Sequence, residues 1–403
     1  MKKSFEVVIA GAGMVGLTAA ALLATNGQRH RMTLRVIDAG VRPRFDPDAD
    51  MALRVSALSA GSAATFRKLQ VWDRIVAGRA CPFREMIVWD GSRPPAGPDT
   101  LRFDAAEFAV PELGHIVENI VVQEALLVLL DRLGVEIRFD AALADLHALE
   151  GRCIIELENG GSLEADLLVG ADGSNSIVRR CARIAATSWQ YPQSAFVTHL
   201  VPAEPHRNTA WQRFLPDGPL ALLPLWDGRV SVVWSTTPAV SAVAMEASDA
   251  ALGRQVTDAS DGILGALTAG GPRASFPLLS RYASAYVKPG VALIGDAAHS
   301  IHPLAGQGAN LGIADAAQLS RVVCAAVADG DNPGDWPVLR RYERTRKGAN
   351  QSMLYFVDGL NGLFSSPTRP VAALRSAGMR LFNRSGPLRR RVVATALGVI
   401  DSE

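Results

Sequence analysis

Residues 5–38 read FEVVIAGAGMVGLTAAALLATNGQRHRMTLRVID, and this stretch decides the fold. A β-branched run is followed by a glycine-rich turn, an alanine- and leucine-rich helix and, at residues 34–37, a second apolar strand. Gly11 permits the tight turn, Gly13 lets the backbone approach a pyrophosphate, and Gly16 lets the helix pack closely against the strand. The stretch predicts an α/β fold that begins with a Rossmann-type nucleotide-binding unit.

An acid, Asp38, ends the second strand about 20 residues after the last glycine of this turn. A carboxylate there can accept hydrogen bonds from both hydroxyls of an adenosine ribose, which suits the unphosphorylated ribose of FAD or NAD. The glycine pattern alone is weak evidence, but here the strand, the helix and the acid supply its context. The residues expected to bind the nucleotide are Gly11, Ala12, Gly13, Met14, Val15, Gly16, Asp38 and Ala39.

Two further strand ends carry polar motifs. An apolar run at 165–170 leads into Asp172 and Gly173, which could place a carboxylate beside a cofactor, although Asp-Gly is more often a plain turn. Residues 290–315, GVALIGDAAHSIHPLAGQGANLGIAD, combine an apolar strand, an acid and a glycine-rich loop, which is a more specific pattern than a simple turn requires. Asp296 can bind a ribityl hydroxyl, and the following glycine-rich loop opens a helix. The free N–H groups of that helix would face the pyrimidine end of an isoalloxazine and stabilise the reduced flavin.

These motifs, with the segments 54–59, 115–123 and 342–346, resemble the class A flavoprotein monooxygenases of the para-hydroxybenzoate hydroxylase fold. The similarity is closest to the ubiquinone-biosynthesis hydroxylases, and the motifs occur in the family's order from residue 7 to about 346. The resemblance implies a glutathione-reductase-like, Rossmann-type FAD domain that binds FAD non-covalently. One departure is Ala52, where many relatives have an acid, so the contacts of the 50–54 loop are left open.

Carried over by position, the resemblance implies that Arg54 and Gln123 reach the pyrophosphate and ribityl region of FAD. Asp172 would lie between FAD and the visiting nicotinamide nucleotide, and Asp296 would hold the ribityl chain. The environment of the flavin C4a atom would consist of Pro303, Gly306, Gln307 and Gly308. Other residues implied to contact the cofactor are Gly295, Ala309 and Asn310.

The same resemblance implies an FAD-dependent monooxygenase. NAD(P)H would reduce the flavin at the FAD domain itself, because no second G-x-G-x-x-G follows. O₂ would form a flavin C4a-hydroperoxide that hydroxylates an aromatic ring, with a prenylated phenol or quinone precursor of ubiquinone biosynthesis as substrate. No acid or base is assigned, since His299 and His302 fit structural hydrogen bonding better than catalysis.

Three alternatives stay open at this point. The chain could hydroxylate a soluble phenol or polyketide, or it could be a flavin halogenase, although the W-x-W pair of that family is missing from the sequence. It could also be a non-catalytic flavoprotein subunit of a biosynthetic complex.

A second domain interrupts the first. Four apolar or alternating segments separated by Asp-Gly turns predict an antiparallel sheet above the flavin: 195–201, 211–215, 220–226 and 230–235. The tryptophans on these segments are more often core residues than cavity lining: Trp211, Trp226 and Trp234. We expect a discontinuous FAD domain at 1–73, 104–183 and 283–365, an inserted substrate domain at 74–103 and 184–282, and a C-terminal helical segment at 366–403.

Composition describes an ordinary globular protein. The balance of 41 basic and 40 acidic residues gives no sign of nucleic-acid binding, and the four cysteines, far apart and without a C-x-x-C pair, predict no metal site. The apolar stretch 7–24 contains three ordered glycines, which argues against a signal peptide. We expect a cytoplasmic protein, at most peripheral at the inner membrane surface.

The segment Arg369–Ile400 is the place to look for docking. It holds seven arginines and no acidic residue. A set of residues shares one face of a predicted helix there: Val371, Leu374, Gly378, Leu381 and Phe382. Such a basic amphipathic helix could lie on an anionic bilayer. Two other interpretations stay open: the segment contacts a partner of a biosynthetic complex, or its apolar face packs on the FAD domain.

Overall fold

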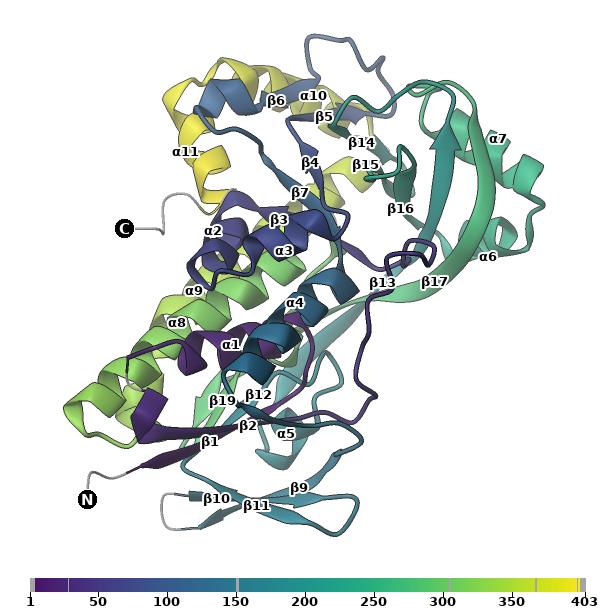
Figure 1. Cartoon of the computed structure of the whole chain (residues 1–403). Helices are drawn as coiled ribbons and strands as arrows, with labels where there is room; N and C mark the ends of the chain where they lie inside the picture. Colours follow the sequence, from purple (N-terminus) through teal and green to yellow (C-terminus); the bar gives the residue numbers. More distant parts are fainter. Residues whose placement is uncertain are drawn as a thin grey trace.

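The computed structural model describes residues 4–27, 29–149, 152–303, 306–366, 368–396 and 398. A mostly parallel sheet with helices forms one part of the molecule, and a large, mainly antiparallel sheet forms the other (Figure 1). The first sheet runs in the order β18 (Val287–Lys288), β19 (Val291–Leu293), β12 (Leu167–Gly170), β1 (Phe5–Ala10), β2 (Met32–Ile37) and β8 (Glu136–Arg138). The predicted α/β fold class is confirmed.

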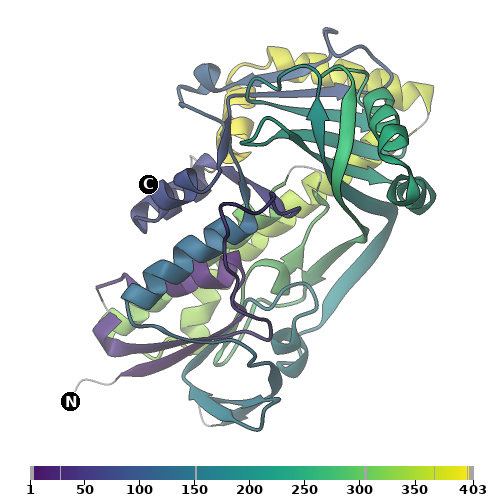
Figure 2. The same cartoon turned by 45° about the vertical axis from the view of Figure 1, so that its right-hand side comes forward.

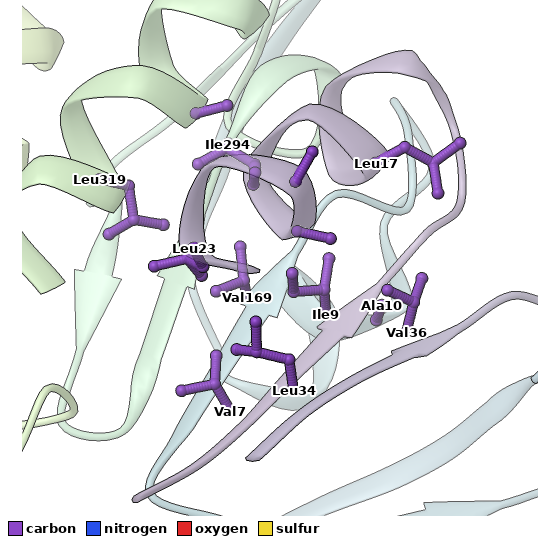
Figure 3. Packing of buried hydrophobic residues seen from close by; sticks show 14 of the residues in the cluster. Val7, Ile9, Ala10, Leu17, Leu23, Leu34, Val36, Val169, Ile294 and Leu319 are labelled. Atoms are coloured by element: carbon purple, nitrogen blue, oxygen red, sulfur yellow. The ribbon is translucent and has the colours of Figure 1, made fainter. Parts of the chain in front are cut away.

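The parallel sheet forms because its central strands are apolar on both faces. Val7 and Ile9 of β1 are fully buried, and Leu23 of α1 (Met14–Ala24) packs close to them (Figure 3). Gly11 has a φ of +113°, and a Cβ there would lie 2.3 Å from the carbonyl oxygen of Ala171, so only glycine fits the turn. Further helices of this part are α2 (Ala60–Lys68), α3 (Trp72–Ala77), α4 (Asn119–Arg132) and α5 (Ile177–Cys181). A small outlying sheet consists of β9 (Leu143–Leu149), β10 (Arg152–Leu157) and β11 (Ser162–Ala165).

The large sheet has eight strands. Their order is β20 (His299–Ser300), β17 (Leu267–Ala283), β13 (Ala186–Pro202), β16 (Val230–Thr236), β15 (Gly218–Pro224), β14 (Thr209–Leu215), β5 (Glu85–Asp90) and β6 (Leu101–Asp104). Its outer face is covered by α6 (Pro238–Glu246) and α7 (Asp249–Ala259) (Figure 2). Trp234 and Trp211 lie on this outer face, whereas Trp226 follows β15 and is 61% exposed. The domain ranges given above stay predictions.

A three-stranded sheet, β3 (Val55–Ser59), β7 (Gly114–Glu118) and β4 (Cys81–Phe83), lies between these two parts. On one face Leu58 and Val117 belong to the core of the parallel-sheet domain. On the other face Ala57 and Ile116 pack toward the inner side of the large sheet. We call this second set the interlayer cluster; it comprises Met51, Phe83, Ala105, Leu113, Ile116, Ala210 and Leu225, with Val55, Ala57, Met86, Phe103, Phe108, Val110 and Leu223 packed around them.

Four helices complete the chain: α8 (Gly308–Asp329), α9 (Trp336–Ser365), α10 (Arg369–Arg384) and α11 (Pro387–Ala396). By length and composition α8 could cross a membrane, but most of it is buried among α1, α2 and α9. The end of α9 reaches the large sheet, where the Phe364 ring stacks on Phe214 with 3.8 Å between centroids.

The packing of α10 corrects one interpretation of the C-terminal segment. Among its described side chains Arg375, Ser376 and Met379 are buried, and Met379 packs in a cluster with Val88 and Phe214 of the large sheet and with Val357 and Phe364 of α9. Arg375 donates from Nε to Oδ2 of Asp90 on β5 at 2.5 Å, which fixes the rotation of the helix. Leu374 and Leu381 therefore point outward and are 67% and 71% exposed. Of the segment Arg369–Ile400, residues 397, 399 and 400 lie outside the described residues.

Candidate functional site

Three motif-bearing turns meet at one edge of the parallel sheet. They follow β1, β12 and β19, which are adjacent parallel strands, so their carboxyl ends share this edge. The side chain of Val15 joins the first turn to the third: a Cβ on Gly295 would lie 3.2 Å from it, and one on Gly312 only 2.5 Å. Both positions need glycine because α1, α8 and the loop after β19 converge there.

The turn after β1 leaves room for an anion. The N-terminus of α1 has no side-chain cap, and a Cβ on Gly13 would meet no atom of the described residues within 4 Å. Free backbone N–H groups and the helix dipole at such an end attract phosphate. Asp38 holds the turn, because its Oδ2 accepts from the Ala12 N–H at 2.5 Å, and Gln123 donates to the Ala12 carbonyl at 3.2 Å. Ala39, beside Asp38, is exposed.

The start of α8 is a second uncapped helix end. A Cβ on Gly308 would also meet nothing within 4 Å among the described residues, and no side chain caps the helix at Gln307. The preceding residues Pro303 and Gly306 are described, whereas 304–305 between them lie outside the described residues. This N-terminus fits the negative charge that collects on a reduced flavin. Ala309 packs at the edge of the core.

Asn310 is predicted to bind the cofactor, and the structure gives its side chain internal partners. Its Oδ1 accepts from the Ser59 N–H at 2.9 Å and the Ser62 hydroxyl at 2.7 Å. Its Nδ2 donates to the carbonyl of Ala57 at 2.9 Å. The side chain therefore ties the first turn of α8 to β3.

Asp296 presents a free carboxylate at the same edge. Its side chain is exposed, and it has no hydrogen bond or ion pair with the described residues. Desolvation by the surrounding protein atoms raises the pKa of this carboxyl, whereas the charges of His299 and Arg54 act to lower it. Arg54 is likewise exposed on the loop before β3. Within the described part of the chain the side chains of Asp296 and Arg54 have no hydrogen bond or ion pair, so this acid and this cation could meet the hydroxyl and phosphate groups of FAD.

Asp172 and Arg179 connect the second motif to the third. Asp172 Oδ2 accepts from the N–H groups of Ile177 at 2.7 Å and Val178 at 3.0 Å, and so caps α5. Its Oδ1 is buried without a partner among the described residues. The buried Arg179 donates to the carbonyl of Ala297 at 2.7 Å. The place of Asp172 beside a visiting nicotinamide nucleotide stays a prediction.

A buried network under the third motif was not predicted as a unit. Asp315 of α8 accepts from His299 Nε2 at 2.6 Å, from Arg346 Nε at 2.7 Å and from Asn350 Nδ2 at 3.0 Å. Burial alone would raise the pKa of Asp315, but His299 and Arg346 lower it to about 2. His299 thus has the structural hydrogen bond expected of it, and the loop after β19 is clamped to α8 and α9. His299 and Arg346 stood in the quoted motifs, which was the available signal, whereas Asn350 lies outside them.

His302 also makes a structural contact. Its Nε2 donates to Oε1 of Gln193 at 3.1 Å, and its ring meets the Tyr191 ring edge-on at 5.0 Å. Burial lowers the pKa of His302 to about 4, so the ring is neutral near pH 7.

At Ala52, where many relatives have an acid, an acid from another strand contacts the loop. The Ala52 N–H donates to Oε1 of Glu118 at 2.6 Å, and Arg79 lies 3.5 Å from Oε2 of the same carboxylate. Glu118 ends β7 and is 1% exposed. The acid that anchors the loop before Arg54 therefore comes from β7.

Comparisons with known proteins agree with this geometry. The chain matches the family model described as FAD binding domain over residues 4–357. It is 37% identical over 397 residues to 3-demethoxyubiquinol 3-hydroxylase of Escherichia coli (strain K12), with 98% of each chain covered. It is 34% identical to the mitochondrial ubiquinone biosynthesis monooxygenase COQ6 of Danio rerio, covering 97% of this chain and 89% of that protein. The crystal structure of p-nitrophenol 4-monooxygenase PnpA from Pseudomonas putida DLL-E4 shares the fold, with a TM-score of 0.76, 19% identity and coverage of 99% and 98%.

The fold and the three turns define an FAD-dependent monooxygenase, and FAD is its cofactor. Within that class the chain belongs to the FAD monooxygenases of ubiquinone biosynthesis. The resemblance drawn from the motifs is confirmed, and so is the assignment as an enzyme. The individual contacts of the predicted site residues with FAD stay predictions.

Proposed function

We propose that this enzyme uses NAD(P)H and O₂ to hydroxylate the ring of a prenylated phenol or quinol precursor of ubiquinone. The observation that carries the proposal is the position of the uncapped α8 N-terminus next to the interlayer cluster. A Cβ on Gly306 would lie 3.4 Å from the Cβ of Ala57, which belongs to that cluster. An apolar ring and tail would therefore find an apolar surface beside the flavin-facing loop.

When bound, FAD would supply the redox chemistry, namely hydride acceptance from NAD(P)H and activation of O₂ for transfer to the ring. The chain's own residues do the rest. The α1 N-terminus holds the pyrophosphate, Asp296 binds the ribityl chain, and the α8 N-terminus stabilises negative charge on the pyrimidine end of the ring. The apolar interlayer keeps water away from the reacting atoms. The names of the relatives support a ubiquinol-type substrate.

A substrate panel tests this proposal. The FAD-loaded full chain is given NADH or NADPH in air with a short-tailed demethoxyubiquinol, a prenylated phenol, or a tail-less soluble phenol. We expect hydroxylated product, identified by mass spectrometry, only from the prenylated compounds. Product from the soluble phenol alone would favour a soluble-substrate hydroxylase, and the absence of FAD-dependent NAD(P)H oxidation would favour a non-catalytic subunit. Either result contradicts the proposal.

We also propose that α10 contacts the anionic surface of the inner membrane, where prenylated substrates reside, so that the protein is cytoplasmic and peripheral. Leu374 and Leu381 stand outward on one face of the helix, and Arg380 and Arg384 of the same helix are also exposed. Each cation near such a surface contributes about 1 kcal/mol. Arg375 is not available, because it is paired with Asp90.

Liposome flotation tests the contact. The full chain should float with anionic vesicles at low salt, less at high salt, and little with neutral vesicles. A Leu374→Ser/Leu381→Ser variant should lose the vesicle binding that persists at high salt. An Arg380→Gln/Arg384→Gln variant should lose the additional binding seen at low salt. Equal, negligible flotation in every condition would contradict membrane docking, and would leave a protein partner as the occupant of this face.

A further inference from the structure

Two polar side chains on the inner face of the large sheet lack partners although they are fully enclosed. His199 of β13 and Ser231 of β16 stand opposite each other in the antiparallel register. They are 1% and 0% exposed. Both ring nitrogens of His199 and the hydroxyl of Ser231 are without a hydrogen-bond partner among the described residues.

The register shows what this pair faces. Leu200 and Val230, one residue further along each strand, belong to the outer cluster under α6 and α7. Because side chains alternate across a strand, His199 and Ser231 face the other way, toward the FAD domain. Ser231 is aligned with Leu223 of β15, which packs on the interlayer cluster. The pair therefore lies on the same side of the large sheet as the interlayer cluster, which also contains Ala57 beside Gly306.

Such groups need an explanation, because leaving a buried polar group unsatisfied costs about 1–3 kcal/mol and is uncommon in native proteins. Burial lowers the pKa of His199 to about 4, and the nearby Arg229 acts in the same direction, whereas Asp227 and Asp50 oppose it. The imidazole is therefore neutral near pH 7 and offers one donor and one acceptor. A neutral pair of this kind matches the hydroxyl or methoxy oxygens of a phenol ring better than a carboxylate.

We propose that His199 and Ser231 hydrogen-bond the oxygen substituents of the substrate ring and orient it against the flavin. The proposal rests on the proposed function and deepens it, because the two residues would select which ring carbon is presented. A substrate with hydroxyls placed elsewhere would leave the pair unsatisfied and bind less well.

The test compares three variants of the FAD-loaded full chain: His199→Phe, Ser231→Ala and, as a matched control, Trp234→Phe. Trp234 lies on the same strand as Ser231, and its Nε1 is also buried without a partner among the described residues, but it faces the outer cluster. The probes are a short-tailed prenylated phenol and its methyl ether, whose binding is followed through the flavin absorbance. The ether cannot donate a hydrogen bond to the imidazole.

We expect wild type and Trp234→Phe to prefer the phenol over the ether. His199→Phe and Ser231→Ala should bind the phenol about three- to tenfold more weakly, the loss expected for one neutral hydrogen bond, and His199→Phe should lose the preference for the phenol. Both should divert more NAD(P)H from product to hydrogen peroxide. Their thermal stability should be equal to or above that of wild type, since an unpaired group is removed.

Unchanged affinity, preference and coupling in both variants would overturn the inference. A fall in stability with unaltered preference would do the same, because it would show a purely structural role. Failure of the wild-type protein to bind or hydroxylate any prenylated phenol would instead contradict the proposed function itself.

Discussion

Arg346 of α9 donates from Nε to Oδ1 of Asp315 on α8 at 2.7 Å. The same carboxylate accepts hydrogen bonds from His299 Nε2 and from the Gly295 N–H. The loop after β19 is thus held by a buried ion pair between two helices. Asp296 directly follows Gly295 and stays free.

Replacing Asp315 by Asn should destabilise the protein strongly. The buried Arg346 would lose its anionic partner, and breaking a buried pair from one side typically costs about 3–5 kcal/mol. Chemical denaturation measures the loss, with Asp329→Asn, an exposed position on the same helix, as control. Equal unfolding free energies for the two variants would contradict the role of the pair.

The same carboxylate predicts an acid limit. The pKa of Asp315 is lowered from 3.8 to about 2, so its stabilising contribution is complete above about pH 3.8 and is lost as the pH falls toward 2. The unfolding free energy of the wild type should therefore fall in this window more steeply than that of Asp315→Asn. Parallel curves would show that other carboxylates control acid unfolding.

Asp296→Ala should weaken FAD binding while leaving the apoprotein stable. Losing a charge-assisted hydrogen bond to the ribityl chain, about 1.5–3 kcal/mol, reduces affinity roughly ten- to a hundredfold. The apoprotein loses no described contact, so its melting temperature should not change. FAD titration followed by fluorescence measures the affinity, and unchanged retention would remove Asp296 from the site.

Alanine substitutions in the N-terminal turn should impair folding at Gly11 and Gly16, but should affect only FAD binding at Gly13. A Cβ on Gly16 would lie 2.0 Å from the carbonyl oxygen of Gly11, so Gly16→Ala should impair folding of the apoprotein. A Cβ on Gly13 would stand in open space, so Gly13→Ala should fold normally and lose FAD affinity. A folded Gly13→Ala protein with wild-type FAD affinity would contradict the assignment of the phosphate site.

The docking of α10 should depend on Asp90. Asp90→Asn would leave the buried Arg375 without its anionic partner, and residues 368–396 should become more sensitive to limited proteolysis. Glu107→Gln is the control, because it breaks the ion pair of Glu107 with Arg389, which is more exposed than the pair of Asp90 with Arg375. This substitution should change the free energy of unfolding by no more than about 1 kcal/mol. Equal proteolysis of both variants would show that other contacts hold α10.

The sequence motifs predicted that three turns would meet at one edge of the sheet, because each motif ends an apolar strand. Parallel strands bring such ends together, so the turns at Gly11, Asp172 and Gly295 could be expected at one edge before any coordinates. The free state of Asp296 agrees with the function expected of that position.

Contacts that depend on tertiary approach were beyond the motifs. The side chain of Asn310 is bonded to Ser59, about 250 positions away in the chain, and no local pattern shows that pairing. The periodicity of residues 371–382 correctly placed Leu374 and Leu381 on one face of α10. Periodicity does not show whether a face is buried or exposed; here the ion pair of Arg375 with Asp90 sets which face of α10 packs on the protein. His199 belongs to none of the motifs, and its strand contains other polar residues such as Thr198, so no sequence signal singled it out.

Oxygen labelling tests the central claim most directly. The FAD-loaded protein, NAD(P)H and a short-tailed prenylated phenol are incubated under isotopically heavy O₂ in ordinary water, and the product is analysed by mass spectrometry. The account predicts one heavy oxygen atom in the ring of each product molecule, with one NAD(P)H consumed for each hydroxylation. Unlabelled product, or NAD(P)H oxidation that yields only hydrogen peroxide with every prenylated phenol tried, would contradict it.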